Sequence, residues 1–245
     1  MLKLILLDMD STLAESKQRV TEDVLFILEE LVSVFEVGVI SGAKFEQFER
    51  QLLSCHLYNL KNLHILPTCG TQYRKYNETS RSWRIIYDEV LSSEEKEQIL
   101  YSVNRHTKKY QFCSIPDQIE DRGSQITWSA KGQSAHPAVK KSWDPTNEKK
   151  KELRDLISGD LPSFEVRTGG TTSIDITKKG RDKAFGTKRL LDILNLDVSD
   201  CLFFGDALHE GGNDFPIKEM GIACVEVRDY HDTMVRLREV LGAPS

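Results

Sequence analysis

The chain has 245 residues, of which 39% are hydrophobic and 29% charged, and its 33 lysines and arginines against 38 aspartates and glutamates give a net charge of −5. This composition is typical of a folded globular protein and excludes a disordered or fibrous chain. The mild acidity argues against a protein that mainly binds nucleic acid, which needs a basic face. For this reason we expect no nucleic-acid partner. No apolar stretch reaches the roughly 18 residues of a membrane-spanning helix, so we expect no membrane partner either.

Five cysteines occur without a Cys-x-x-Cys pair, and one is left over after any pairing. Reduced thiols in a cytoplasmic protein fit this pattern better than a disulfide framework does. The apolar run Leu2 to Leu7 ends at Asp8 with no small-residue cleavage site behind it. It therefore predicts a buried strand rather than a signal peptide.

Strand and helix patterns alternate at both ends of the chain. The expected N-terminal elements are a strand over Leu2 to Leu7, a helix over Thr21 to Phe35, a strand over Val37 to Ser41 and a helix over about Lys44 to Leu53. The expected C-terminal elements are a helix over about Lys183 to Leu194, a strand over Cys201 to Gly205, a helix near Asp214 to Met220, a strand over Ile222 to Val227 and a last helix to about Leu241. This alternation predicts an α/β fold with a doubly wound, Rossmann-like parallel sheet.

The pattern changes between about Gly70 and Gly180. Short strands are predicted at Thr71 to Tyr76, Gln125 to Ser129, Phe164 to Arg167 and Thr172 to Ile176, and helices at Ser93 to His106 and Thr146 to Ile157. This mixture indicates an inserted α+β domain. We therefore expect a discontinuous core of residues 1–80 and 181–245 and an insertion of residues 81–180.

Polar groups follow the strands of the predicted core. They are Asp8 and Asp10, Ser41 and Gly42, Asp206 and Asp214, with Lys183 opening a later helix. Open α/β sheets place their working groups beyond the carboxyl ends of the strands. One carboxylate in such a place is as often a helix cap as a catalyst, but several gathered together repel one another unless a cation lies among them. Hard oxygen ligands of this kind select Mg²⁺.

These motifs together resemble those of the haloacid dehalogenase-like (HAD) phosphotransferase superfamily. The matching segments are Asp-Met-Asp-Ser-Thr from Asp8 to Thr12, Ser41-Gly42, Lys183, and the acidic segment from Gly205 to Asp214. The resemblance implies that Asp8 is the nucleophile that forms an aspartyl-phosphate and that Asp10 is the acid–base residue. It also implies that Ser41 and Lys183 hold the phosphoryl oxygens.

The same resemblance implies a Mg²⁺ site. Its ligands would come from Asp8, Asp10, Asp206 and Asp214, with Asp10 contributing its backbone carbonyl. Gly42 and Asn213 adjoin these residues, and we expect both to contact the substrate.

The spacing of the motifs bears on the branch of the superfamily. Ser41 and Lys183 are 183 − 41 = 142 residues apart, whereas one or two β/α units need only about 30 residues each. The remainder corresponds to an inserted cap, as in the type IIB branch. Within that branch the segments Phe204 to Asp214, Gly180 to Lys183 and Gly169 to Asp175 are similar to motifs of eukaryotic-type phosphomannomutases.

Some residues of the predicted cap also resemble those of phosphomannomutases. By resemblance Ser173 and Asp175 would face sugar hydroxyls, and Arg122 matches one of the mutases' phosphate-binding arginines. Gln133 stands where a second arginine is expected, with Lys131 close by. A mutase binds a bisphosphate in two orientations and needs two anion sites, so this departure favours a phosphatase.

Three functions remain open on the sequence. The leading hypothesis is a Mg²⁺-dependent phosphatase that hydrolyses a small phosphorylated metabolite, a phosphosugar, through an aspartyl-phosphate. The alternatives are a phosphohexose mutase and, remotely, a receiver-type phosphoacceptor signalling module, whose fold needs only about 120 residues and no large insertion. The sequence leaves the oligomeric state open, with a homodimer among the alternatives.

Overall fold

The computed structural model describes residues 1–15, 18–54, 57, 59–110, 115, 117–169 and 171–242. It divides into a core unit, Met1–Asp88 with Asp182–Ser245, and a cap unit, Glu89–Arg181. The first boundary lies eight residues later than the sequence suggested, after residue 88 rather than 80. The reason is strand β5 (Ser82–Asp88), which pairs with β4 in the core sheet.

The core unit is built on a sheet of seven strands in the order β11-β10-β1-β2-β3-β4-β5. Five neighbouring strands are parallel: β11 (Ala223–Glu226), β10 (Cys201–Gly205), β1 (Leu4–Asp8), β2 (Glu36–Ile40) and β3 (Leu63–Leu66). The edge is an antiparallel hairpin of β4 (Gln72–Asn77) and β5. The predicted doubly wound sheet is thus confirmed. Strand β4 falls within the predicted core of residues 1–80, whereas β5 falls within the range predicted for the insertion.

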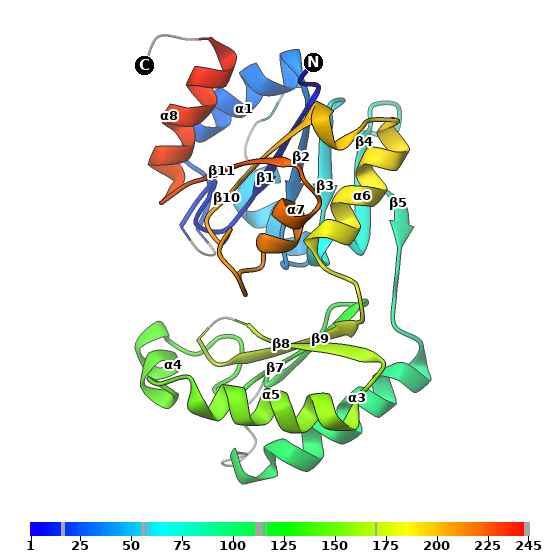
Figure 1. Ribbon diagram of the computed structural model, residues 1–245, viewed down its shortest axis with the longest axis vertical. Coiled ribbons are helices and arrows are strands. Elements are labelled where there is room, and N and C mark those ends of the chain that lie inside the picture. Colours follow the sequence, from blue (N-terminus) through cyan, green and yellow to red (C-terminus); the bar gives the residue numbers. More distant parts are fainter. Residues whose placement is uncertain are drawn as a thin grey trace. The chain divides into compact units, whose positions relative to one another are not determined.

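Helices cover both faces of this sheet (Figure 1). On one face lie α1 (Glu22–Val34), α2 (Phe45–Phe48) with its π-helical continuation Glu49–Leu53, and α8 (Tyr230–Leu241). On the other lie α6 (Lys183–Leu194) and α7 (Phe215–Glu219). Strand β1 serves both layers, because Ile5 and Leu7 pack into the first and Leu4 and Leu6 into the second.

The predicted start of α6 is confirmed at Lys183. The Asp182 carboxylate caps the helix by accepting a hydrogen bond from the Phe185 backbone N–H at 3.1 Å. An N-cap of this kind satisfies one of the N–H groups that the first turn leaves without a partner. Lys183 is thereby fixed in the first turn of the helix.

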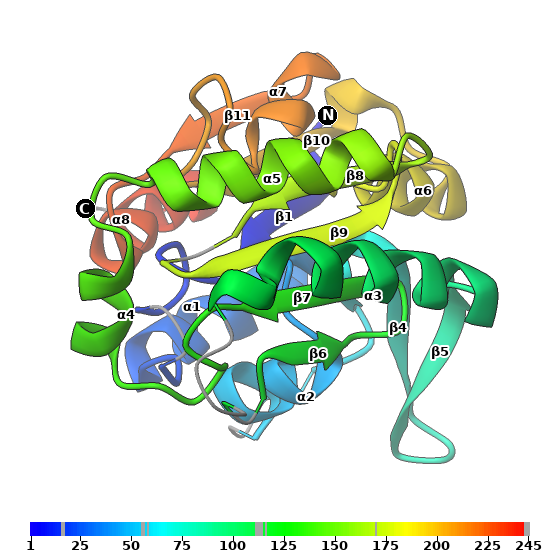
Figure 2. The ribbon, with the colours of Figure 1, turned by 90° about the horizontal axis from the view of Figure 1, so that it is seen from below.

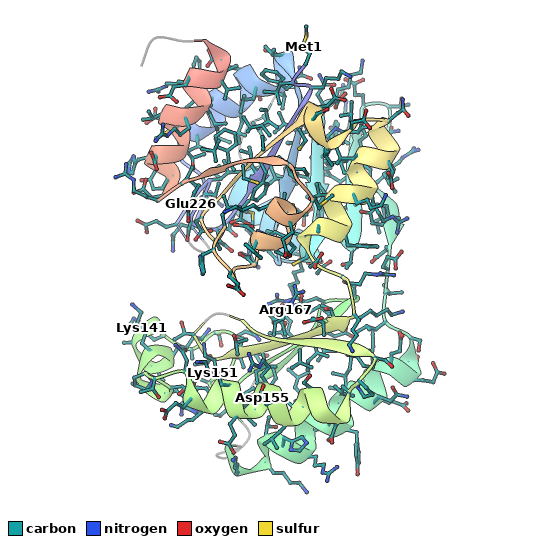
Figure 3. The ribbon with its side chains drawn as sticks, viewed as in Figure 1. Met1, Lys141, Lys151, Asp155, Arg167 and Glu226 are labelled. Atoms are coloured by element: carbon teal, nitrogen blue, oxygen red, sulfur yellow. The ribbon has the colours of Figure 1, made fainter. Side chains whose placement is uncertain are left out.

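The cap unit is a four-stranded antiparallel sheet with helices on one face (Figures 1 and 2). Its strands, in sheet order, are β6 (Ile119–Asp121), β7 (Gln125–Ser129), β9 (Ser173–Lys178) and β8 (Phe164–Thr168), and its helices are α3 (Ser93–Thr107), α4 (Pro137–Trp143) and α5 (Glu148–Asp160). Alternate strand residues such as Trp128 and Ile176 pack against α3 and α5 in one apolar core. Arg167 of β8 lies on the opposite face, turned away from the helix that bears Lys151 and Asp155 (Figure 3).

Short 3₁₀ turns occupy Thr68–Gly70, Lys108–Tyr110 and Val198–Asp200. Cys69, Cys201 and Cys224 are thiols, while Cys55 and Cys113 lie outside the described residues. Among the described helices, none combines the length and apolarity needed to cross a bilayer.

Candidate active site

The candidate site of the core unit lies where β1 and β10 end side by side. The two strands are parallel, with Leu7 paired to Phe204. Asp8 ends β1 and Asp206 follows directly after β10. Parallel strands bring their carboxyl ends to the same edge of a sheet, so the register alone places these two carboxylates close together.

The side chain of Lys183 extends from the first turn of α6 to this edge of the core sheet. Its side chain is fully buried and its ammonium contacts one oxygen of Asp8 and, at 2.5 Å, Oδ1 of Asp214. Burial alone would lower the pKa of Lys183, but the charges of Asp8 and Asp214 and their hydrogen bonds raise it above its ordinary value. The ammonium is therefore held in its charged form between two carboxylates.

The pKa of Asp8 is also shifted. Burial raises the pKa of Asp8 to about 7, Lys183 opposes this increase, and Asp214 adds to it. Thr12 donates a long hydrogen bond, 3.5 Å, to Asp8 Oδ2. A carboxylate whose proton affinity depends on neighbouring charges in this way marks a candidate functional group.

Three carboxylates of this edge form a candidate metal site. Asp8, Asp206 and Asp214 each offer an oxygen, and these oxygens lie within 4.8 Å of one another. Burial and then the charge of Asp214 raise the pKa of Asp206. Three acidic groups share the single charge of Lys183, and their hard oxygen donors fit Mg²⁺.

The turn after β10 places Asp214 by close backbone contacts. Asp214 Oδ2 accepts a hydrogen bond from the Ala207 N–H at 3.1 Å. A Cβ on Gly205 would come within 2.4 Å of the same oxygen, so a larger residue would displace the carboxylate. The glycine of the predicted Gly-Asp motif is thus a packing requirement. Asn213 is exposed beside Asp214 in this turn.

Asp10 lies in the turn after β1. Two glutamine side chains contact it, one from α2 and one from the π-helical continuation of α2. Gln47 Nε2 lies 3.5 Å from Asp10 Oδ2, and Gln51 Nε2 lies 3.4 Å from Asp10 Oδ1. The sequence interpretation did not single out either glutamine. The available signal was Gln51, a polar residue between Phe48 and Leu52 in an amphipathic helix pattern.

Ser41 directly follows β2, whose last residue Ile40 pairs with Asp8. The serine is buried, and its Oγ accepts a hydrogen bond from the Ala43 N–H at 3.2 Å. Gly42 lies next to it, and a Cβ there would lie at an ordinary contact distance, 3.8 Å, from Cys69 Sγ. Ser41 therefore stands one residue beyond the level of Asp8 on the neighbouring strand.

The sequence-predicted cap residues are all in the cap unit. Arg122 donates to Glu120 Oε2 from Nε and Nη2, at 3.0 and 2.8 Å. Asp175 Oδ1 accepts a hydrogen bond from Thr127 Oγ1 at 2.7 Å, and burial raises the pKa of Asp175. Ser173 begins β9 opposite Ser129.

Lys131 and Gln133 lie in the segment after β7. Lys131 is half-buried in a turn. The Gln133 backbone carbonyl accepts from Lys140 Nζ at 2.6 Å, whereas its side-chain Nε2 is buried without a hydrogen-bond partner among the described residues. The structure thus gathers Asp8, Asp206, Asp214 and Lys183 in the core unit and places the predicted sugar-facing residues in the cap unit.

Residues 5–217 match a family model described as haloacid dehalogenase-like hydrolase. Similar curated proteins include Phosphomannomutase 1 of Homo sapiens, 25% identical over 97% of this chain and 91% of its own length. The phosphomannomutase of Encephalitozoon cuniculi is 28% identical over 97% of this chain and 93% of its own length.

Solved structures share the fold at lower identity. An IMP-nucleotidase of Plasmodium falciparum superposes with a TM-score of 0.71 at 16% identity, covering 98% of this chain and 68% of its own. A haloacid dehalogenase-like hydrolase of Bacteroides thetaiotaomicron gives 0.66 at 14% identity, with coverage of 98% and 100%.

Proposed function

Because the chain belongs to the haloacid dehalogenase-like hydrolase family, and is therefore a phosphatase or a phosphosugar mutase, we propose that it is a Mg²⁺-dependent phosphatase of a small phosphorylated metabolite. The observation that carries this proposal is the Asp8 carboxylate beside the charged Lys183 and the acidic groups of Asp206 and Asp214. A nucleophile, a counter-cation and a set of metal ligands are what phosphoryl transfer requires.

In the first step an Asp8 oxygen attacks phosphorus. The P–O bond to the leaving group breaks, and Asp10 gives its proton to the departing oxygen. Ionised Asp8 is the reactive form, and the ammonium of Lys183 favours that form in a buried place where the carboxyl would otherwise hold its proton near neutral pH.

In the second step water attacks the phosphorus of the aspartyl-phosphate. Asp10, now ionised, accepts a proton from the water, and the bond between phosphorus and the Asp8 oxygen breaks. Inorganic phosphate leaves and both carboxyl groups return to their starting states. Asp10 thus alternates between acid and base in one cycle.

Charge on the transferring group needs further stabilisation. Ser41 would donate its hydroxyl hydrogen to a phosphoryl oxygen, and Lys183 would supply its positive charge. A Mg²⁺ ion held by Asp8, Asp206, Asp214 and the Asp10 carbonyl would add positive charge against the phosphoryl oxygens.

A phosphosugar is the substrate class that we propose. The names of the relatives, phosphomannomutase and IMP-nucleotidase, point to phosphorylated small molecules. The cap-sheet face turned away from α3 and α5 carries Thr127, Ser173 and Asp175, whose hydroxyl and carboxyl groups suit the hydroxyls of a sugar.

The alternative is a phosphohexose mutase, which the named relatives favour. A mutase needs a cationic site for the second phosphate. Arg122 is the candidate, but it already donates two hydrogen bonds to Glu120, and Gln133 stands where the mutase pattern has a second arginine. These two features favour hydrolysis.

Two assays test the proposal. Purified protein should release phosphate from an aryl phosphate with Mg²⁺ and lose this activity in EDTA, and retained turnover in Asp8→Asn would contradict the nucleophile assignment. A panel of phosphosugars should then be measured for both phosphate release and isomerisation. Faster conversion of a hexose 1-phosphate to its 6-phosphate than to free phosphate, with a trace of bisphosphate present, would favour the mutase.

A further inference from the structure

We propose that Gln47 and Gln51 form an amide clamp that orients the Asp10 carboxylate for its proton transfers. This inference rests on the proposed function, in which Asp10 is the acid–base residue. Gln47 lies in α2 and Gln51 in its π-helical continuation, Glu49–Leu53, both within the core unit. Each directs a side-chain nitrogen toward a different oxygen of Asp10. They are positioning residues, because they act through Asp10 and not on the substrate.

The burial of Gln51 is the first reason for the assignment. Its side chain is 2% exposed, on a helix face shared with Phe48 and Leu52. Burying an amide without hydrogen bonds is unfavourable, so an apolar residue would suit a purely structural position better. Gln51 avoids that cost because its Nε2 donates to the Gln18 carbonyl at 2.7 Å and its Oε1 accepts from Gln47 Nε2 at 2.6 Å.

These two strong hydrogen bonds fix which way both amides face. A flipped Gln51 would turn its oxygen toward the carbonyl of Gln18, and two acceptors would repel. With Gln51 fixed, its oxygen requires the nitrogen of Gln47 as donor. Each NH₂ group has two hydrogens, so each glutamine keeps one for Asp10.

The backbone supports the same arrangement. The segment Glu49–Leu53 is π-helical, a local widening that occurs often at functional sites. The Gln51 backbone carbonyl accepts from the Val20 N–H at 2.9 Å. Side chain and backbone of Gln51 therefore both bind the segment Gln18 to Val20, which leads from the Asp10 turn to α1.

The clamp has consequences for the two proton transfers. Donors on both Asp10 oxygens restrict rotation of the carboxyl group, so that the remaining lone pair or proton points in a defined direction. The distances of 3.4 and 3.5 Å are long, and catalytic hydrogen bonds often tighten only when substrate is bound. Loss of the clamp should therefore slow the steps that use Asp10 and leave substrate binding almost unchanged.

The test compares Gln51→Met, Gln47→Met and the matched control Arg50→Met, whose native side chain is exposed on the same helix. For each variant kcat and KM are measured with an aryl phosphate, together with the fraction of protein trapped as phosphoaspartate in the steady state. An aryl leaving group needs little protonation, whereas the attack of water needs Asp10 as base. A misoriented Asp10 should thus cause phosphoaspartate to accumulate, an effect that a general loss of folded protein does not produce.

We expect Gln51→Met to lower kcat about tenfold, a part of the 10²- to 10⁴-fold effect of general acid–base catalysis. KM should fall together with kcat, because slower hydrolysis of the phosphoaspartate leaves kcat/KM for an aryl phosphate almost unchanged. Gln47→Met should act in the same direction to a smaller extent. Both should raise the phosphoaspartate fraction, as Asp10→Asn should. If Gln51→Met fails to fold, the half-exposed Gln47 decides the question.

Two results overturn the inference in different ways. If wild type forms phosphoaspartate and Asp10→Asn accumulates it, but neither glutamine variant changes kcat or the trapped fraction, the clamp alone is wrong. If wild type forms no phosphoaspartate and releases no phosphate, the proposed function fails and the clamp loses its role with it.

Discussion

Lys183 brings one buried positive charge to a group of three carboxylates, of which Asp8 and Asp214 are buried. Removing one partner of a buried ion pair leaves the other charge without compensation and typically costs about 3–5 kcal/mol. We therefore expect Lys183→Met to lower the free energy of unfolding by about that amount and to abolish phosphatase activity. Urea denaturation measures the first effect and phosphate release the second.

Lys188→Met is the matched control for Lys183. Lys188 lies on the same helix, but its side chain is 69% exposed and it pairs with Asp192 at the surface. Such pairs contribute about 0–1 kcal/mol, so this variant should unfold almost as wild type does. Added Mg²⁺ should stabilise Lys183→Met more than wild type, since more negative charge is left to neutralise. Equal stability of the two lysine variants would contradict the role given to Lys183.

His64 is a buried titratable residue of the core unit, outside the candidate site. Its Nε2 lies 2.7 Å from Glu36 Oε2 and its Nδ1 lies 2.7 Å from the Tyr73 hydroxyl. The neutral ring satisfies both contacts, because Nε2–H donates to the carboxylate and Nδ1 accepts from the hydroxyl. Burial lowers the pKa of His64, with the hydrogen bond to Glu36 opposing this decrease.

This lowered pKa predicts a loss of stability in acid. Below the ordinary histidine pKa of about 6.5 the unfolded chain binds a proton that folded His64 does not, so unfolding becomes more favourable as the pH falls. The pKa of Glu36 is lowered chiefly by its hydrogen bond to His64, and its contribution is lost at still lower pH. Between pH 7.5 and 5.5 the raised pKa of Asp8 acts in the opposite direction in both proteins. We therefore expect the free energy of unfolding of wild type to fall relative to that of His64→Phe as the pH is lowered over this range. Equal pH dependence in the two proteins would refute the assignment.

At the scale of elements, two glycines let α6 approach the turn Thr68–Gly70. A Cβ on Gly186 would lie 2.5 Å from Gly70 Cα and 2.7 Å from the Cys69 carbonyl oxygen. Both neighbours are backbone atoms, so the helix itself would have to move, and Lys183 with it. We expect Gly186→Ala to cost roughly 1–3 kcal/mol of stability, as overpacking does, and to lower kcat.

Gly159→Ala is the control for this change. Gly159 lies in α5, and a Cβ there would meet nothing within 4 Å. Alanine in a helix is favoured over glycine by roughly 0.5–1 kcal/mol, so this variant should be as stable as wild type or more stable. Thermal denaturation and phosphate release should be measured for both variants. If Gly186→Ala behaves like Gly159→Ala, the close approach does not position α6.

The elements differ in how far local sequence could predict them. The apolar run ending at Asp8 is a complete local signal, and β1 was predicted from it. The helix predicted over about Lys183 to Leu194 is α6. The hairpin of β4 and β5 has an alternating pattern like that of the cap strands. The hairpin belongs to the core sheet because His64 of β3 pairs with Lys75 of β4. The local sequence of neither strand indicates this pairing.

Some residues of the candidate site could likewise be predicted from the local sequence, and others could not. Carboxylates at strand ends were predictable because strand polarity alone sends them to one edge of the sheet. Gln51 and Asp10 are in contact although they are 41 positions apart in the sequence, and Gln51 lies in a π-helical turn. A helical period of 3.6 places Gln51 on the buried face but cannot indicate what it contacts there.

At the scale of the whole molecule, each unit has an apolar core of its own. Ile5 and Val39 belong to the core unit, and Ile126 and Ile174 to the cap unit. Every proposed metal ligand is in the core unit. A ligand stabilises only the structure that binds it, by about 2.7 kcal/mol at a concentration 100 times its dissociation constant. Binding of Mg²⁺ should therefore act on the two units unequally.

Hydrogen exchange measured strand by strand tests this expectation. With Mg²⁺ present, amides of β1 (Leu4–Asp8) and β10 (Cys201–Gly205) should exchange more slowly, because their opening would break the metal site. Amides of β7 (Gln125–Ser129) and β9 (Ser173–Lys178) should exchange at unchanged rates. A monovalent salt at equal ionic strength is the control, and Asp206→Asn should abolish the slowing. An equal slowing in all four strands would mean that the two units unfold as one, and no slowing in β1 and β10 would contradict the metal site.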